Sequence, residues 1–231
     1  MKAVILCAGN GERLKPLTEH APKPLILLKE KPLLSYIFSS LPEGIDEVFL
    51  VVREKYEDLF NHFVKDNPVN KKVTIVFQDP TTQGTYYALM AAKDYVSNED
   101  RFLVLNGDDI FLKEDLEKLL LLKSPSYGLS YKKLSVRYRT CDLDTLNQEI
   151  ASFRLLTEEE KDTPVPCFSG AYTLTHEFFS YEPVYVGDEA GIPHTLFGTA
   201  SSVKYLLLRE WIQINTLEDL SIAERSPLLL I

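Results

Sequence analysis

Two glycines, an arginine and two lysines stand close together near the start of the chain. Residues 7–28 read CAGNGERLKPLTEHAPKPLILL and contain Gly9, Gly11, Arg13, Lys15 and Lys23. Glycine lets a backbone come close to a ligand, and successive backbone N–H groups can cradle a phosphate. Arginine and lysine supply positive charge. The stretch therefore predicts a loop that binds a small anionic ligand.

The short glycine pattern does not identify that ligand by itself. The dinucleotide-binding fingerprint G-x-G-x-x-G fits Gly9 and Gly11, but Leu14 stands at the third glycine position. The P-loop pattern G-x-x-x-x-G-K-[ST] has no match in this stretch. Taken alone, the two glycines are equally consistent with a turn that has no function.

The loop follows the first of four short, almost continuously apolar segments, which are residues 2–8, 47–53, 72–78 and 101–107. Such runs, rich in β-branched residues, are typical of parallel strands buried on both faces. Helix-like stretches separate them at residues 32–41, 54–66 and 85–96. The alternation predicts an α/β fold with a doubly wound, mostly parallel, Rossmann-like mixed sheet. Ligands of such sheets bind outside the carboxyl ends of the strands, so we expect loops 8–31, 78–85 and 107–113 to gather there.

The second half of the sequence is less regular. It predicts a helix at 114–123, strands at 127–134, 167–174 and 202–208, and a closing helix at 216–225. The polar residues 156–167 are expected to be an exposed excursion. No hexapeptide repeat follows, so no appended β-helix domain is expected.

Composition excludes several classes of protein. The 231 residues are 45% hydrophobic and 26% charged, with a formal net charge of −9. This charge argues against a general binder of nucleic acid or of an acidic membrane. No apolar run is long enough for a signal peptide or a membrane span, and three cysteines without metal-ligand spacing disfavour a disulfide framework. We expect a cytoplasmic protein, with homo-oligomerisation left open.

A longer string resembles a known family signature. The pattern G-x-G-x-R-L-x-P-x-T-x-x-x-P-K-P is matched by residues 9–24. It is the signature of nucleotidyltransferases that join a nucleoside triphosphate to a sugar-1-phosphate. Residues 104–111 (VLNGDDIF), 83–89 (QGTYYAL), 169–172 (SGAY) and 211–224 (WIQINTLEDLSIAE) are similar to further segments of the family. The length is similar to that of single-domain members that activate muramate, mannose, glucose or choline phosphates.

This resemblance implies a single Rossmann-like (GT-A-like) domain over 1–231 with a small sugar-side lobe. Residues 1–112 would be the nucleotide-binding half and residues 113–231 the acceptor-side half. In the implied reaction an acceptor phosphate oxygen attacks the α-phosphorus and pyrophosphate leaves, so catalysis is mostly positioning and charge stabilisation. The family pattern implies that Arg13 holds the triphosphate and Lys23 reaches the α-phosphate and the incoming phosphate. It also implies Mg²⁺ at Asp108, with Asn215 as a neutral ligand. For Asp108, a turn after a buried strand is the alternative reading.

The resemblance assigns two further groups of residues. The nucleotide-binding set is Ala8, Gly9, Asn10, Gly11, Gln78, Gln83, Gly84 and Thr85. The set on the acceptor side is Asp109, Gly170 and Tyr172. For residues 83–85 a plain helix start remains an alternative, with Thr85 near the cap.

Three departures from the family pattern leave questions open. Gln213 and Asn215 are neutral where the family often has an aspartate as second metal ligand, and either could complete the metal site if they share a strand face. Lys161 resembles the sugar-phosphate lysine of an E-K-P motif, but Asp162 replaces the proline, which favours a solvated charge run. The nucleobase and the acceptor are not readable, although residues 83–85 favour a pyrimidine.

Three functions therefore stay under consideration. The favoured one is an Mg²⁺-dependent sugar-phosphate or alcohol-phosphate nucleotidyltransferase. A non-catalytic regulator that binds nucleotide sugars is the alternative, because the metal site departs from the family pattern. A glycosyltransferase on a related sheet would leave the R-L-x-P and P-K-P elements unexplained.

Overall fold

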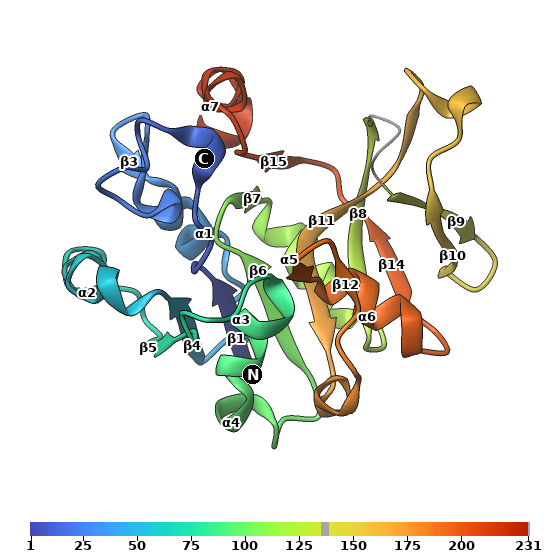
Figure 1. Cartoon of the computed structure of the whole chain (residues 1–231), viewed down its shortest axis with the longest axis horizontal. Coiled ribbons are helices and arrows are strands. Elements are labelled where there is room, and N and C mark those ends of the chain that lie inside the picture. The colour runs from blue at the N-terminus through green and yellow to red at the C-terminus, as the bar shows by residue number, and fades with distance from the viewer. Residues whose placement is uncertain (135–138, 231) are drawn as a thin grey trace.

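Nine strands form one mixed sheet in the computed structural model, which describes residues 1–134 and 139–230. Its strands are β1 (Lys2–Leu6), β4 (Glu47–Val52), β5 (Lys72–Phe77), β6 (Phe102–Asn106), β8 (Ser126–Lys133), β9 (Arg139–Asp144), β10 (Glu149–Leu155), β11 (Pro164–Leu174) and β14 (Lys204–Leu207). Their spatial order is β5-β4-β1-β6-β11-β8-β14-β10-β9, which runs from left to right in Figure 1. The α/β fold expected from the sequence is confirmed.

The four apolar segments of the first half are the parallel part of this sheet. β4 and β6 pair with β1 in parallel, and β5 pairs with β4 in parallel. β11 then runs antiparallel to β6 and carries the sheet into the second half. Because β5, β4, β1 and β6 point the same way, the loops after all four lie at one edge of the sheet.

Helices cover both faces of the sheet. They are α1 (Leu33–Ser40), α2 (Glu57–Asp66), α3 (Thr85–Ala91), α4 (Lys93–Val96), α5 (Lys113–Leu121), α6 (Ile192–Thr199) and α7 (Leu217–Ala223). Alternate residues of β1 serve opposite faces: Val4 and Leu6 pack in the cluster that contains α3 and α6, whereas Ala3 and Ile5 pack in the cluster that contains α1, α2 and α5. The single helix expected at 85–96 is two helices, which meet at Ala92 with φ −92° and ψ 2°.

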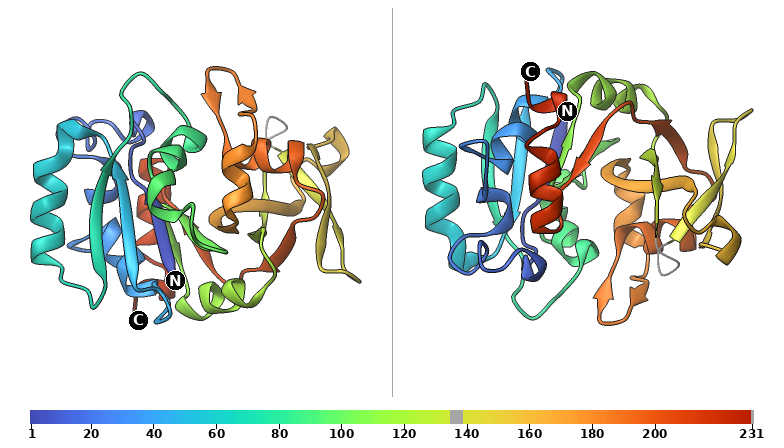
Figure 2. Two further views of the ribbon diagram at one scale, coloured as in Figure 1. Left: turned by 90° about the horizontal axis from the view of Figure 1, so that it is seen from below. Right: turned by 90° about the horizontal axis from the view of Figure 1, so that it is seen from above.

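The second half contains elements that the sequence did not predict. β9 and β10 form an antiparallel hairpin, which Figure 2 shows at the opposite end of the molecule from α2. Helix α6 was also not predicted. The expected excursion at 156–167 is a 3-10 helix at Glu158–Glu160 followed by the start of β11, so its last residues belong to the sheet. The predicted strands near 127, 167 and 202 and the predicted helices near 114 and 216 are confirmed.

Three pairs of short strands complete the fold. β2 (Leu27–Leu28) pairs with β3 (Lys31–Pro32), β7 (Asp109–Phe111) with β15 (Trp211–Gln213), and β12 (Tyr185–Val186) with β13 (Glu189–Ala190). The β7–β15 pair brings the end of the chain back to the strand end after β6.

The last part of the chain packs against the first loop. A third buried cluster joins Leu14, Ile26, Leu28 and Leu33 to Ile110, Ile214, Ala223, Leu228 and Leu229. Figure 1 shows the red helix α7 beside the blue segment that carries β3, and Figure 2 shows the same proximity from above. This cluster fixes the segment after β15 next to the loop that is predicted to bind an anion.

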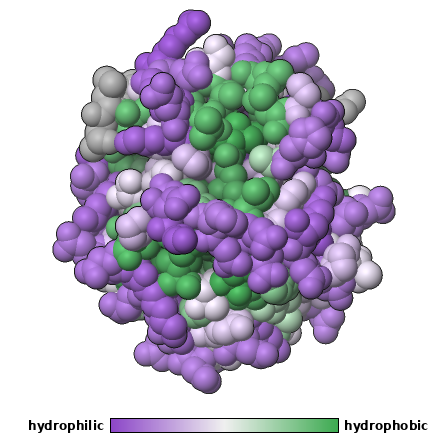
Figure 3. Space-filling model, turned by 90° about the vertical axis from the view of Figure 1, so that its left-hand side faces the viewer, coloured by the Kyte–Doolittle hydropathy of each residue, from purple (hydrophilic) through white to green (hydrophobic). Residues whose placement is uncertain are grey.

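Hydrophilic residues dominate the side of the molecule that lies at the left in Figure 1. Figure 3 shows this side, where hydrophobic residues occur in places between hydrophilic ones. The amphipathic helix α2 buries Phe60 and Phe63 against the sheet and leaves acidic residues of its first turn, Glu57 and Asp58, toward solvent. Within residues 1–134 and 139–230, no helix has the length and apolar character needed to cross a membrane.

Candidate active site

The loop after β1 is shaped by Gly11. Its φ of +68° lies in the left-handed region, which glycine adopts without strain. Its carbonyl oxygen accepts a hydrogen bond of 2.8 Å from Thr18 Oγ1, and a Cβ at this position would lie 2.8 Å from Thr18 Cγ2. Gly11 therefore closes the turn that leads into the 3-10 helix Glu12–Leu14, where Leu14 is buried and Arg13 is exposed.

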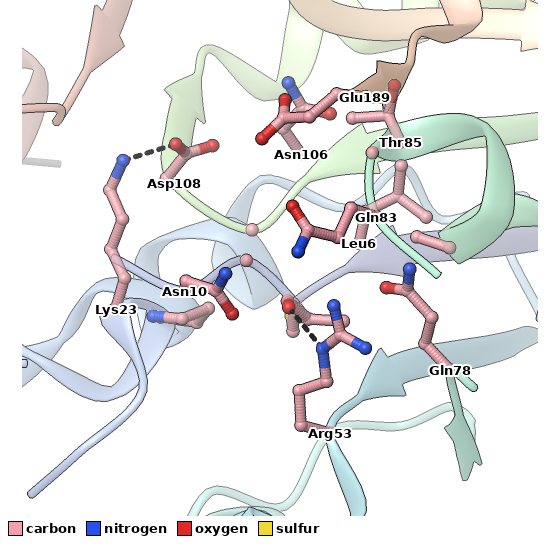
Figure 4. A pocket seen from close by; sticks show the side chains of 17 residues that line it. Leu6, Asn10, Lys23, Arg53, Gln78, Gln83, Thr85, Asn106, Asp108 and Glu189 are labelled. Carbon is pink, nitrogen blue, oxygen red and sulfur yellow. Dashed lines mark hydrogen bonds and ion pairs between the residues drawn. The ribbon is translucent and has the colours of Figure 1, made fainter. Parts of the chain in front are cut away.

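Four of the predicted catalytic and metal-binding residues meet at one point. Lys23 Nζ donates hydrogen bonds to Asp108 Oδ2 and, over 3.1 Å, to Asn215 Oδ1. Arg13 Nη2 donates to the same Asn215 oxygen over 3.0 Å. The Lys23–Asp108 ion pair is drawn in Figure 4. Two cationic side chains and two side chains with oxygen acceptors, from segments up to 202 residues apart, thus converge.

Asn215 is held in place by the start of α7. Asp219 Oδ2 accepts hydrogen bonds of 2.8 Å from the backbone N–H groups of Asn215 and Thr216, and Thr216 Oγ1 accepts one of 3.1 Å from Asp219 N. This reciprocal cap ties the helix to the residue before it. β15 ends at Gln213, so Asn215 lies just beyond the strand, where Ile214 N still donates a hydrogen bond of 3.1 Å to Asp108 O. Asn215, not Gln213, contacts the two cations.

A cavity of about 200 Å³ opens beside this cluster, at the carboxyl edge of the parallel strands. Nine of the residues predicted from the sequence line it, namely Ala8, Gly9, Asn10, Lys23, Gln78, Gln83, Gly84, Thr85 and Asp108. Gly11 is not among them, because it turns toward Thr18. The glycine loop and the predicted base-binding segment therefore form facing walls of one cavity (Figure 4).

Gln78 presents its amide oxygen to this cavity. Its Nε2 donates to Thr82 O over 3.2 Å and to Thr82 Oγ1 over 3.3 Å, so the amide orientation follows from these acceptors. The side chain is otherwise buried, and it lines the cavity. Gln78 can therefore accept a hydrogen bond from a donor on the ligand.

The second half of the chain completes the cavity through the segment at 184–192. Gly84 has φ +94° and ψ 164°, and a Cβ there would lie 2.2 Å from the Ala190 carbonyl oxygen. One residue later, Thr85 Oγ1 accepts a hydrogen bond of 3.0 Å from Ile192 N. This close contact carries Glu189 of β13 into the cavity lining, opposite the glycine loop. Glu189 was not predicted.

Among the other lining residues that were not predicted, Arg53 and Asn106 have polar side chains that can donate hydrogen bonds from nitrogen. Arg53 follows β4, and Asn106 ends β6. The rule that gathers loops at the carboxyl ends of parallel strands applies to β4 as well, so it could have indicated Arg53. Asn106 directly precedes the Gly107–Asp108 turn and could have been included with it.

The three residues expected on the acceptor side form buried support instead. Asp109 is fully buried and its Oδ1 accepts a hydrogen bond of 2.9 Å from Trp211 Nε1. A Cβ at Gly170 would lie 2.0 Å from Asp109 Oδ2, so glycine is needed there for β11 to pass this carboxylate. Tyr172 is 1% exposed and stacks on Tyr127 with ring centroids 4.8 Å apart. A direct contact of Asp109 or Tyr172 with an acceptor does not match this burial, which corrects the expectation.

Burial also sets the charge of Asp109. Removal from water, followed by the negative charge of the neighbouring Asp108, raises the pKa of Asp109 well above its usual range, and the Trp211 hydrogen bond opposes this only in part. Asp109 Oδ2 and Asn106 Oδ1 have no hydrogen-bond partner among the described residues.

Lys161, which resembles the sugar-phosphate lysine of the family, is exposed just after the 3-10 helix Glu158–Glu160.

Comparison with known proteins places this geometry in a family. The sequence profile described as "Nucleotidyl transferase" matches residues 2–126. The chain is 38% identical over 185 residues to the D-glycero-alpha-D-manno-heptose 1-phosphate guanylyltransferase of Campylobacter jejuni, with 78% of each chain covered. It is 42% identical over 134 residues to the bifunctional protein GlmU of Methanocaldococcus jannaschii, a match that covers 58% of this chain and 30% of that protein. The chain thus spans under a third of the length of that relative.

Solved structures share the fold over nearly the whole chain. The inositol-1-phosphate CTP transferase from T. maritima superposes with a TM-score of 0.77 at 20% identity, covering 94% of this chain and 90% of that one. A UDP-glucose pyrophosphorylase complexed with UDP-glucose superposes with a TM-score of 0.82 at 18% identity, covering 96% of both chains. The profile match over more than half of the chain and the guanylyltransferase relative, aligned over 78% of both chains, together show that this chain belongs to the nucleotidyl transferase family.

Proposed function

We propose that the protein transfers a nucleotidyl group from a nucleoside triphosphate to a sugar-1-phosphate or an alcohol phosphate and releases pyrophosphate. The observation that carries this proposal is the convergence of Arg13, Lys23, Asp108 and Asn215 beside a cavity walled by the glycine loop. In the reaction an acceptor phosphate oxygen forms a bond to the α-phosphorus, and the bond from that phosphorus to the bridging oxygen of pyrophosphate breaks.

The two cations have different tasks in this reaction. Arg13 is exposed and presents a planar fork of N–H donors, which suits the triphosphate and the departing pyrophosphate. The Lys23 ammonium is a compact positive charge on a side chain that is 11% exposed. It suits the α-phosphate, whose oxygens carry negative charge in the transition state. Backbone N–H groups of Gly9 and Asn10 would face the phosphates.

The donor set beside Lys23 fits Mg²⁺. The oxygens of Asp108 and Asn215 both accept hydrogen bonds from the Lys23 ammonium, so they already face one positive group. No group of three or more His, Cys, Asp or Glu side chains that could hold a metal occurs among residues 1–134 and 139–230. Mg²⁺ is commonly held by one or two carboxylates together with substrate phosphates. We therefore assign Asp108 and Asn215 as its protein ligands; when bound, the ion would neutralise charge on the phosphate oxygens.

The activities of similar proteins support the acceptor class. They include a heptose 1-phosphate guanylyltransferase and an inositol-1-phosphate CTP transferase, which differ in nucleobase and in acceptor. Their common element is a phosphate on a polyhydroxyl ring. We propose the same class of acceptor here, and a cytoplasmic location, where nucleoside triphosphates are available.

A second candidate function follows from the neutral residue in the metal site. With Asn215 in place of a carboxylate, the chain could bind a nucleotide sugar and regulate another process without catalysis. Such a regulator would use the same cavity but release no pyrophosphate.

Pyrophosphate release separates the two candidates. The protein would be incubated with UTP, CTP, GTP, ATP or dTTP, each combined with glucose-, mannose-, heptose- or inositol-phosphate, in Mg²⁺ and in EDTA. Release that requires both an acceptor and Mg²⁺ supports the enzyme. No release with any pair, together with calorimetric binding of a nucleotide sugar, would support the regulator and overturn the enzyme.

A further inference from the structure

One arginine connects the two facing walls of the cavity. Arg53 directly follows β4, and its guanidinium donates to three backbone carbonyl oxygens. Nε donates to Ala8 O over 3.0 Å, Nη1 to Asp79 O over 2.9 Å, and Nη2 to Thr82 O over 3.1 Å. Figure 4 shows Arg53 beneath the cavity, with the first of these bonds drawn. Three of the five guanidinium N–H groups are thus used to hold backbone from two loops.

The turn that Arg53 holds is already ordered by its own side chains. Asp79 Oδ1 accepts a hydrogen bond of 2.7 Å from Thr81 N, and Thr82 Oγ1 donates to Asp79 O over 2.9 Å. Gln78 Nε2 donates to Thr82 O, so the cavity-lining glutamine belongs to the same turn. Residues 78–82 therefore form one hydrogen-bonded turn, and Arg53 joins that turn to the glycine loop.

The remaining carbonyl that Arg53 contacts, Ala8 O, belongs to the opposite wall of the cavity. Ala8 lies at the start of the glycine loop and lines the cavity that Gln78 lines from the other side. A single planar group bonded to both walls sets the distance between them. Among the described residues, Arg53 makes no hydrogen bond to Lys23, Asp108 or Asn215, so it stands apart from the groups that act on the phosphates.

We propose that Arg53 is a positioning residue that fixes the width of the nucleotide cavity and thereby sets nucleotide affinity and base selectivity. This inference rests on the proposed function in so far as the ligand is a nucleoside triphosphate. Without Arg53 the 78–82 turn would keep its internal hydrogen bonds but would be fixed against the glycine loop only when the nucleotide binds, and the entropy lost on fixing it would weaken binding. The transfer step would change little, because its cations and metal ligands keep their contacts.

The test compares Arg53→Ala and Arg53→Lys with Lys55→Ala as the matched control. Lys55 lines a neighbouring cavity together with Arg53, but its ammonium lies 4.6 Å from the Tyr56 ring centroid and makes no hydrogen bond to either loop in the described part of the chain. Arg53→Ala and Lys55→Ala remove the same charge. Calorimetry with UTP, CTP, GTP, ATP and dTTP in Mg²⁺ gives the dissociation constants, and steady-state kinetics gives KM and kcat.

We expect Arg53→Ala to weaken binding of the preferred triphosphate by about tenfold or more. The ratio of the dissociation constants of the second-best and the preferred triphosphate should become smaller. The value of kcat should change less than KM, and Arg53→Lys should lie between Arg53→Ala and the wild type, because one ammonium cannot reach all three carbonyls. Lys55→Ala should match the wild type. Hydrogen exchange of the peptide covering residues 78–85, measured without ligand, should rise in Arg53→Ala.

Several outcomes would overturn the proposal. Equal weakening by Arg53→Ala and Lys55→Ala would indicate a general charge effect. Wild-type affinity in Arg53→Lys would show that the three-way contact is not needed, and this variant decides the matter if Arg53→Ala does not fold. If the wild type binds none of the five triphosphates, the proposed function is overturned as well. If the wild type binds and converts its substrates, and Arg53→Ala has the same affinity and kinetics, only the role of Arg53 is overturned.

Discussion

Replacing Gly84 with alanine should destabilise the protein and separate the base-binding wall of the cavity from the second half of the chain. The φ of +94° and ψ of 164° at this residue lie in a region that is essentially restricted to glycine. The added Cβ would lie 2.2 Å from the Ala190 carbonyl oxygen and 2.7 Å from Ala190 N. Both neighbours are backbone atoms, so the contact cannot be relieved by rotating a side chain.

The size of the effect follows from the contacts that must be lost. Forcing alanine into this backbone region costs about 1–3 kcal/mol. Moving β13 away would also break the Ile192 N to Thr85 Oγ1 hydrogen bond of 3.0 Å and the weaker Ala190 N to Gln83 O bond of 3.4 Å. Each such bond contributes about 0.5–1.5 kcal/mol net. We therefore expect the free energy of unfolding to fall by about 2–6 kcal/mol, together with a weakened affinity for the nucleoside triphosphate.

Urea denaturation followed by circular dichroism measures this change, and Gly44→Ala is the matched control. A Cβ added at Gly44 would meet no atom of the described residues within 4 Å beyond its chain neighbours, and the φ of Gly44 is not positive. Alanine there should therefore leave both stability and affinity unchanged. Equal unfolding free energies for Gly84→Ala and the wild type would refute the reasoning from backbone conformation and close contact. A destabilised variant with unchanged nucleotide affinity would show that β13 does not shape the cavity.

Three further predictions concern the charged groups. Arg13→Ala should lower kcat/KM about 10²- to 10³-fold in a pyrophosphate-release assay with little change in urea stability, because the side chain is exposed; full activity would remove the loop from the mechanism. Asp108→Asn should abolish activity, whereas Asn215→Asp should keep it and tighten Mg²⁺ binding in calorimetric titrations by adding a second carboxylate; an active Asp108→Asn protein would contradict the metal assignment. Burial and the charge of Asp108 raise the pKa of Asp109 in the folded state. The free energy of unfolding should therefore fall as pH rises from the ordinary aspartate pKa to that raised value, by up to about 1.4 kcal/mol per pH unit. Urea titrations at a series of pH values measure this fall. Asp109→Asn should remove this fall; the same slope in the variant would show that another group causes it.

The sequence was sufficient for the parts of the fold that depend on local pattern. The apolar runs of β1, β4, β5 and β6 indicated buried parallel strands, and the structure places them side by side. The β9–β10 hairpin has mixed polarity, because its strands expose part of both faces, so no clear period marked it. Its existence depends on pairing with the rest of the sheet, which local sequence does not encode.

The site could be predicted where one continuous segment carries it. The glycine loop and Lys23 lie in one such segment, and the resemblance added Asp108 and Asn215. Glu189 reaches the cavity only because β13 docks on Gly84, a tertiary contact that no motif indicates. The resemblance assigned Asp109 to the acceptor side. Asp108 lies in the turn after β6, whereas Asp109 begins β7 and its side chain is buried beneath the site, a difference that depends on the tertiary packing.

The contact between Arg13 and Asn215 has a consequence for how the protein is made. These residues are 202 positions apart, and the cluster that supports Asn215 also contains Leu228 and Leu229. At synthesis rates of about 5–20 residues per second, the ribosome needs roughly 10–40 s to add the intervening stretch. During that interval the glycine loop already exists without its partner, so a nascent chain cannot yet hold the triphosphate in the arrangement proposed for transfer. The arrangement proposed for transfer would be complete only after Asn215 has been synthesised, and ribosome-bound chains stalled before Asn215 should be inactive.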